Sequence, residues 1–283
     1  MFDDLRVDKT GQIAKFGGLM DRHNGREGNV RLINGTSEPE LTIAAGQTEQ
    51  WRIVNASSAR YVRLSLGGLP FQIIATDGGL IEAPVTATEV LLPPADRVEL
   101  AVGPFDEEGT VLLIEDLPYY RMAGKKRVER FGTIRVAPRK SSTGRVPVRL
   151  REIAPLVTGD ASVTRTVKLG FTLSLRRGLD FVVKGERHHH DEPVKVGELQ
   201  VWDVVNTTMM DHPFHLHGFF FQVLEINGKK PAWRSLEDVI NVPPQATVRI
   251  AWYPDDRPGS WMYHCHILEH HASGMMAHFD VVR

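Results

Sequence analysis

A single cysteine stands among histidines near the end of the chain. Cys265 is the chain's only cysteine, and His264 and His266 lie on either side of it. His270 follows five residues later, and Met275 lies five residues beyond that. Sulfur ligands suit soft metal ions, and imidazole nitrogen suits zinc, copper, iron and nickel. The segment therefore predicts a metal site that includes sulfur.

The segment HPFHLH, residues 212–217, brings three more histidines. Residues two apart on a strand share a face, so His215 and His217 can point into one site. His212 stands just before a proline and can turn toward another site. The same alternation sends Cys265 to the opposite side of its strand from the two histidines that flank it. The spacing therefore predicts two adjacent sites.

The first predicted site collects Cys265, His212, His270 and Met275. A thiolate and two imidazoles with a weak axial thioether form the ligand set of blue-copper electron-transfer sites. A structural zinc site more often takes several cysteines, and a catalytic zinc site keeps a position open for water. We therefore expect copper in an electron-transfer role.

The second predicted site collects His215, His217, His264 and His266, which are nitrogen donors without sulfur. Because Cys265 is covalently joined to two of them, an electron at the first site has a through-bond route to a metal at the second. This arrangement predicts transfer between two redox centres.

The elements that must position these residues are short strands. The chain has 283 residues, which favours two domains. Alternating runs such as LTIAAGQTEQWRIVN and ATVRIAWYP are rich in aliphatic and aromatic residues, and Gly, Pro, Asn and Asp separate them. This pattern predicts antiparallel all-β sandwiches.

Composition excludes several other classes. The net charge of −1 lacks the basic excess that favours nucleic-acid binding. The first residues, MFDDLRVDKTGQIAKFGG, are polar and acidic, so no signal peptide is expected. No stretch approaches the ~18 apolar residues of a membrane span.

Two parts of the chain match each other at an offset of about 150 residues, which indicates two copies of one fold. The matching positions are Gly46, Trp51, Asn55, Phe71, Gln72, Gly78, Pro93 and Pro94 in the first copy and Gly197, Trp202, Asn206, Phe221, Gln222, Gly228, Pro243 and Pro244 in the second. We predict domains at residues 1–137 and 148–283. The linker between them, residues 138–147, is rich in Ser, Gly, Pro and charge.

The first copy has none of the predicted ligands. It reads RYVRLSLGG where the second reads DHPFHLHG. The alignment also sets Ile114, Glu115 and Asp116 opposite the triplet at residues 264–266. If the histidines merely suited the sandwich, the first copy would tolerate them too. We therefore expect metal in the second copy alone.

The segments HPFHLHG and HCHILEHHASGM are similar, at every ligand position, to the two C-terminal copper signatures of the multicopper oxidases. That family includes laccases, ascorbate oxidase, bilirubin oxidase and bacterial cuprous oxidases. The resemblance implies two cupredoxin-like Greek-key β-sandwich domains, the first resembling the copper-free middle domain of three-domain bacterial members. It implies these copper ligands: His212, Cys265, His270 and Met275 for type 1 copper, His215 for type 2, and His217, His264 and His266 for type 3.

The resemblance also implies a laccase-like oxidoreductase. A reduced small molecule or metal ion would give single electrons to the type 1 copper. Cys265, His264 and His266 would pass them to a trinuclear copper cluster, where dioxygen is reduced. A periplasmic or extracellular location is implied by the family alone.

The chain departs from this family in its histidine count. Oxygen reduction there needs eight histidines around the cluster, four of them from H-x-H pairs on another domain, whereas His23 is the only histidine before His188. We therefore expect half of the cluster's ligands to be absent from this chain. An N-terminal cupredoxin domain or a homo-oligomer such as a trimer is a candidate partner. The alternative function is a copper-binding electron-transfer or copper-handling protein that reduces no oxygen by itself.

Other residues that can bind metal have simpler interpretations. The run His188–His190 suits a solvated loop better than a ligand cluster, and His271 suits the surface or a place beside the ligands. Met209 and Met210 more often fill space than guide Cu(I). Asp238 is at least as readily structural as part of a proton relay.

Overall fold

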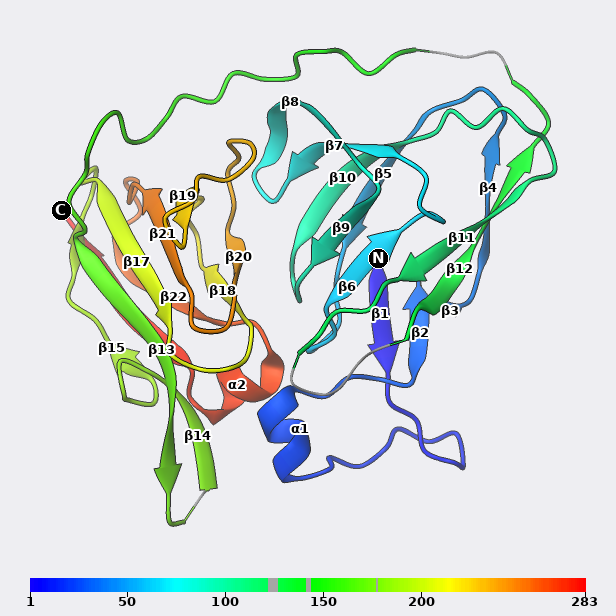
Figure 1. The fold of residues 1–283 in the computed structure, drawn as a ribbon. Coiled ribbons are helices and arrows are strands. Elements are labelled where there is room, and N and C mark those ends of the chain that lie inside the picture. The colour runs from blue at the N-terminus through cyan, green and yellow to red at the C-terminus, as the bar shows by residue number, and fades with distance from the viewer. Residues whose placement is uncertain (122–126, 141–143, 177) are drawn as a thin grey trace. The chain divides into compact units, whose positions relative to one another are not determined.

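The computed structural model describes residues 1–121, 127–140, 144–176 and 178–283, which divide into two compact units (Figure 1). The first unit contains Met1–Phe16, Arg26–Thr76 and Leu80–Glu152, and the second contains Gly17–Gly25, Asp77–Gly79 and Ile153–Arg283. Two short segments from the predicted first domain thus group with the second unit. The predicted domain limits stay a prediction, and residues 141–143 of the predicted linker lie outside the described residues.

The first unit is built from three sheets. In spatial order their strands are β1 (Phe2–Leu5), β2 (Val30–Ile33) and β3 (Thr36–Ser37); β5 (Glu49–Val54), β10 (Arg97–Val102), β7 (Phe71–Thr76) and β8 (Gly79–Ala87); and β4 (Glu40–Ala44), β12 (Glu129–Ala137), β11 (Val111–Asp116), β6 (Val62–Ser65) and β9 (Glu89–Leu92).

The second unit is built from two sheets and two short helices. One sheet contains β14 (Gly178–Val183), β13 (Arg165–Ser174), β17 (Gln200–Asn206), β21 (Thr247–Trp252) and β19 (Gln222–Ile226). The other contains β15 (His189–His190), β23 (Met276–Val282), β22 (Gly259–Cys265), β18 (His212–Leu216) and β20 (Val239–Val242), with β16 (Val194–Lys195) also paired to β23. The helices are α1 (Leu19–Asn24) and α2 (Leu268–Ser273).

The strand orders repeat between the units, as the sequence offset predicts. The order β5–β10–β7 in the first unit matches β17–β21–β19 in the second, and β12–β11–β6–β9 matches β23–β22–β18–β20. The all-β prediction is confirmed by these sheets. No helix among the described residues is long and apolar enough to cross a membrane.

Alternating burial explains why these segments form strands. In β21 the side chains of Val248, Ile250 and Trp252 are buried and face the core, while Thr247 and Arg249, which alternate with the first two, are less buried. Trp202 of β17 packs edge-on against Trp252, with ring centroids 5.1 Å apart. Such contacts bury large apolar areas, and each fully buried aliphatic or aromatic side chain contributes about 1.5–3 kcal/mol.

Two matching asparagines close the same turn in each unit. The side-chain nitrogen of Asn206 donates to the carbonyl oxygens of Met210 and Val242 at 2.6 and 3.0 Å. The side-chain nitrogen of Asn55 donates to the equivalent carbonyl oxygens, at residues 60 and 92, at 2.7 and 2.8 Å. In the second unit this turn leads directly into β18, where the histidines begin.

The counterpart of Cys265 in the first unit is Asp116. Glu115 pairs with Ser65 of β6, as His264 pairs with the equivalent position of β18. The match lies one residue later than in the sequence alignment, and the pairing of β11 with β12 is irregular at the same place, just before Glu115. Sequence comparison alone could not place this shift.

An ion-pair network surrounds Asp116 in the first unit. Its buried carboxylate lies 3.4 Å from Nη1 of Arg60, which is itself 2.9 Å from Glu129. Asp4 contacts the same guanidinium at 2.7 Å. Buried charges are tolerated when paired in this way. The first unit thus has an ion-pair network where the second has a thiol.

Candidate metal centre

The side chains of His212, Cys265 and His270 converge in the second unit. Sγ of Cys265 lies 3.5 Å from Nδ1 of His212 and 3.5 Å from Nδ1 of His270, and the two Nδ1 atoms are 3.2 Å apart. All three residues are fully buried. A thiol and two imidazoles at this spacing can bind one metal ion, and the mixed sulfur and nitrogen set fits copper. We call these three residues the first group.

Strand pairing and a helix turn position the first group. β18 and β22 are neighbours, which brings His212 near Cys265, and α2 follows β22 and returns His270 to the same point. Gly274 ends α2 with φ 120°, a left-handed conformation that favours glycine. The next residue, Met275, is fully buried, and its carbonyl oxygen accepts the N–H of Cys265 at 3.1 Å. The backbone of the predicted axial methionine is therefore hydrogen-bonded to the backbone of Cys265.

Hydrogen bonds on the outer side of each imidazole set its tautomer. Nε2 of His270 lies 3.0 Å from the carbonyl oxygen of His23, which can only accept, so Nε2 carries the proton. Nε2 of His212 lies 2.8 Å from the hydroxyl of Thr208, which itself donates to the carbonyl of Met210 at 3.2 Å. Both Nδ1 lone pairs then face each other at 3.2 Å. Two lone pairs at this distance repel unless a cation lies between them, which fits a metal ion.

His215, His217, His264 and His266 form the second group. Nε2 of His217 is 2.9 Å from Nε2 of His264, and their ligand atoms lie within 4.8 Å of one on His215. The ring of His266 has its centroid 5.6 Å from that of His215 and 5.4 Å from that of His264. Of the four histidines that the alternation predicts for one site, three bring their ligand atoms together, and the ring of His266 lies beside them.

Backbone carbonyls orient two rings of the second group. Nδ1 of His215 donates to the carbonyl oxygen of Asp238 at 2.8 Å, and Nδ1 of His264 donates to the carbonyl oxygen of Cys265 at 2.9 Å. Each ring therefore keeps the lone pair on Nε2, the usual arrangement for histidines that bind metal.

A carboxylate holds the backbone beside His215. Oδ2 of Asp77 accepts the N–H groups of Val239 at 2.9 Å and Asp238 at 3.2 Å. Asp238 supplies the carbonyl that orients His215, and its carboxylate oxygen Oδ1 lies 3.6 Å from Nδ1 of the same ring. Asp77 thus acts on the second group through one stretch of backbone.

Burial keeps three histidines of the second group uncharged. It lowers the pKa of His217 to about 4, of His264 to about 3 and of His266 to about 4, because the charged imidazole is poorly solvated there. Charges on neighbouring histidines lower these pKa values further. At neutral pH these three rings are neutral donors and can bind metal without first losing a proton.

The remaining predicted histidines stand outside both groups. Within the described ranges, three or more potential ligands gather only in the first group and at His215, His217 and His264. His189 lies 2.8 Å from Glu186, while His188 and His190 are exposed, but His189 and His190 form the short strand β15 rather than the predicted loop. His271 is half-buried with its ring centroid 4.4 Å from that of His264, a position beside the ligands.

The two methionines before His212 differ in exposure. Met210 is buried, and its carbonyl takes part in the turn that Asn206 closes. Met209 is 61% exposed, so it does not fill the core as the simpler interpretation assumed.

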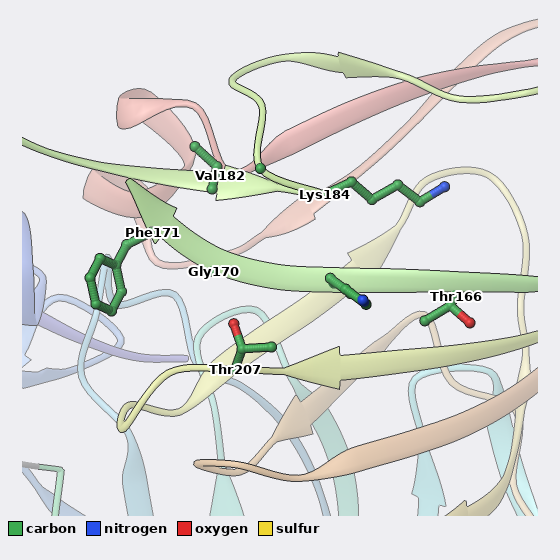
Figure 2. A pocket seen from close by; sticks show the side chains of 8 residues that line it. Thr166, Gly170, Phe171, Val182, Lys184 and Thr207 are labelled. Atoms are coloured by element: carbon green, nitrogen blue, oxygen red, sulfur yellow. The ribbon is translucent and has the colours of Figure 1, made fainter. Parts of the chain in front are cut away.

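A separate cavity of about 460 Å³ lies on the sheet that contains β13, β14 and β17 (Figure 2). Its lining residues are Thr166, Lys168, Gly170, Phe171, Val182, Lys184, Gly185 and Thr207. None of them belongs to either metal-binding group. The amine of Lys184 is engaged by the buried carboxylate of Asp191 at 2.5 Å. The cavity is therefore not part of the metal centre.

Four contacts of the metal centre were missed by sequence reasoning. Phe181 stacks on His270, with ring centroids 3.7 Å apart and planes 22° apart. The others are the hydroxyl of Thr208, the carbonyl of His23 and the carboxylate of Asp77. The glycines after Asp77 signalled a turn but no partner, and His23 carried no local signal.

The sequence matches the multicopper oxidase family twice, over residues 10–109 and over residues 171–283. Among curated relatives, the multicopper oxidase mco of Staphylococcus aureus is 28% identical over 92% of this chain and 54% of its own length. The laccase of Bacillus subtilis (strain 168) is 26% identical over 90% of this chain and 54% of its own length. The chain spans about half the length of the curated relatives it matches.

Solved structures show the same relationship. A multicopper oxidase from Campylobacter jejuni, described as a metallo-oxidase, has a TM-score of 0.85 and 31% identity, and covers 99% of this chain and 62% of its own. McoA multicopper oxidase from Aquifex aeolicus has a TM-score of 0.87 and 29% identity, over 100% of this chain and 65% of its own. The cupredoxin-like fold and the copper cofactor are confirmed by these matches. The chain therefore belongs to the multicopper oxidase family, whose members are copper-dependent oxidoreductases.

Proposed function

We propose that this chain takes part in the one-electron oxidation of a reduced donor, coupled to the reduction of dioxygen. The observation that carries the proposal is the position of Cys265. Its thiol belongs to the first group, while the residue before it in the chain, His264, belongs to the second. One short covalent path therefore joins the two groups.

The first group would hold type 1 copper through His212, Cys265 and His270, with Met275 as a fourth ligand. Copper bound there supplies reversible one-electron redox chemistry. The protein excludes water from the site, because all four residues are fully buried. It also fixes the two imidazoles through hydrogen bonds on their outer nitrogens. A rigid, dry ligand set needs little rearrangement when an electron arrives or leaves.

The second group is proposed to be one half of a trinuclear copper site, with His215 for type 2 copper and His217, His264 and His266 for type 3 copper. Its remaining ligands would come from another polypeptide segment. An N-terminal cupredoxin domain that carries the missing H-x-H pairs is the proposed source. The low pKa values of His217, His264 and His266 support metal binding there at neutral pH.

Copper analysis combined with an oxygen electrode tests this function. We expect the purified chain to turn blue when loaded with copper, and to take up oxygen only when an N-terminal cupredoxin domain with two H-x-H pairs is added. The reduced donors to compare are a phenol and a cuprous or ferrous ion. A chain that binds copper at Cys265 but never consumes oxygen in any such mixture would be an electron carrier. A chain that binds no copper at Cys265 would refute the proposal.

A further inference from the structure

Helix α1 belongs to the unit that holds the metal centre, although it comes from the beginning of the chain. Gly17–Gly25, which contains α1, groups with Ile153–Arg283. In Figure 1, α1 lies against α2, the helix that carries His270. The first group therefore has a neighbour that is 247 residues from His270 in sequence.

The contact between α1 and His270 is made by the backbone. The carbonyl oxygen of His23 lies 3.0 Å from Nε2 of His270. The imidazole of His23 points elsewhere, with Nδ1 2.8 Å from the side-chain oxygen of Asn24. One face of the His270 ring is covered by Phe181, which stacks on it with the ring centroids 3.7 Å apart. The ring is thus held at its outer edge and on one face.

The segment before His23 is itself anchored. The carboxylate of Asp21 is buried and accepts the N–H of Gly17 at 2.5 Å. A Cβ atom at Gly17 would lie only 2.7 Å from that carboxylate, so a larger residue there would displace it. The neighbouring residue of the helix, Met20, is 68% exposed and has no part in the anchor. Asp21 therefore ties the first turn of α1 to the residue that precedes it.

We propose that α1 is a positioning element for His270. The carbonyl of His23 holds the imidazole in the tautomer with the proton on Nε2, and this leaves the lone pair of Nδ1 aimed at Cys265 and His212 before any metal binds. When ligands are already in place, little side-chain entropy is lost as the metal binds. Metal ions that prefer a different coordination geometry are then bound less tightly. The proposal goes beyond the proposed function, because it describes the metal-free chain and does not depend on which ion binds.

NMR of the metal-free chain, labelled at the histidine ring nitrogens, tests the proposal directly. We expect His270 to carry its proton on Nε2 and that proton to exchange slowly with solvent. A proton on Nδ1, or a rapid mixture of both tautomers, would overturn the proposal. Because no copper is present, this result is independent of whether the chain forms a blue site.

Variants of α1 then distinguish an effect of the helix on His270 from a general loss of stability. Asp21→Ala should raise the exchange rate of the Nε2 proton by about tenfold or more, because α1 opens more often. Asp21→Asn keeps an oxygen acceptor and should restore slow exchange. Met20→Ala changes an exposed residue of the same helix and should leave the rate as in the parent chain.

His23→Ala distinguishes the backbone from the side chain. It keeps the carbonyl group, so the Nε2 proton should persist, and its loss in this variant would contradict the backbone assignment. An unchanged exchange rate in a folded Asp21→Ala variant would equally show that α1 does not hold the ring. If Asp21→Ala does not fold, the tautomer of the parent chain and the His23→Ala result still decide the matter.

Discussion

The carboxylate of Asp77 accepts a hydrogen bond from the backbone N–H of Val239 at 2.9 Å, across a sequence separation of 162 residues. The adjacent carbonyl, that of Asp238, accepts Nδ1–H of His215. Asp77 therefore controls the orientation of a proposed copper ligand without touching it. Two backbone N–H groups depend on this one carboxylate.

Asp77→Ala should lower the free energy of unfolding by about 1–3 kcal/mol, because part-buried N–H groups lose their acceptor. Chemical denaturation measures this change. Asp77→Asn is the matched control, since its side-chain oxygen can still accept one N–H group, and it should lose less. Equal stability of the alanine variant and the parent chain would show that water replaces the carboxylate at no cost.

Cys265→Ser should abolish the blue colour of the copper-loaded chain while leaving the β fold intact. Serine has nearly the same shape, but its hydroxyl lacks the soft sulfur that suits copper in both oxidation states. Visible absorption and far-ultraviolet circular dichroism measure the two effects. Blue colour that persists in this variant would contradict the assignment of the thiol.

Phe181→Ala should destabilise the chain by about 3–5 kcal/mol, because it removes a fully buried ring and leaves a cavity next to His270. Phe171→Ala is the control, since Phe171 is 53% exposed on the neighbouring strand and should cost much less. Thermal or chemical unfolding of both variants gives the comparison. Similar losses from both would mean that the stacking on His270 carries no special weight.

The stability of the metal-free chain should fall as the pH drops from about 6.5 to about 4. In the folded chain the pKa values of His217 and His266 are lowered from 6.5 to about 4, so in this interval the unfolded chain binds protons that the folded chain does not. The contribution is fully present above pH 6.5 and is lost as the pH falls through the folded pKa values. Denaturation at a series of pH values measures it.

His266→Gln should flatten this pH profile, since glutamine does not titrate. Other groups, such as carboxylates, also change charge near pH 4, so the difference between the variant and the parent is the informative quantity. Identical profiles for the two proteins would contradict the lowered pKa of His266.

Much of the candidate metal centre could be predicted because the alternation of side chains along a strand involves residues that are close in the sequence. Alternation along β18 and β22 was enough to separate Cys265 from His264 and His266, and the structure brings the predicted residues together in two groups. The internal repeat likewise predicted matching sheet orders. These features depend on residues that are two to ten positions apart, or on similarity between two copies.

The outer contacts could not be predicted, because they depend on tertiary packing. The carbonyl of His23 acts through a backbone atom that every residue possesses, so no residue type marks it. Asp77 lies in a turn, and the residues around it predict the turn but not the hydrogen bonds to the distant backbone at residues 238 and 239. The counterpart of Cys265 was misplaced by one residue, since only the pairing of β11 with β6 shows which residue stands opposite it.

Residues 17–25 and 77–79 group with the second unit, and this limits how the protein could be changed by recombination. A crossover near residue 152 would replace the N-terminal part of the chain. It would therefore also replace the His23 carbonyl oxygen beside His270 and the Asp77 carboxylate that holds the backbone beside His215. A replacement N-terminal part must therefore bring equivalent acceptors at these two positions, even though only the C-terminal part contains the proposed copper ligands.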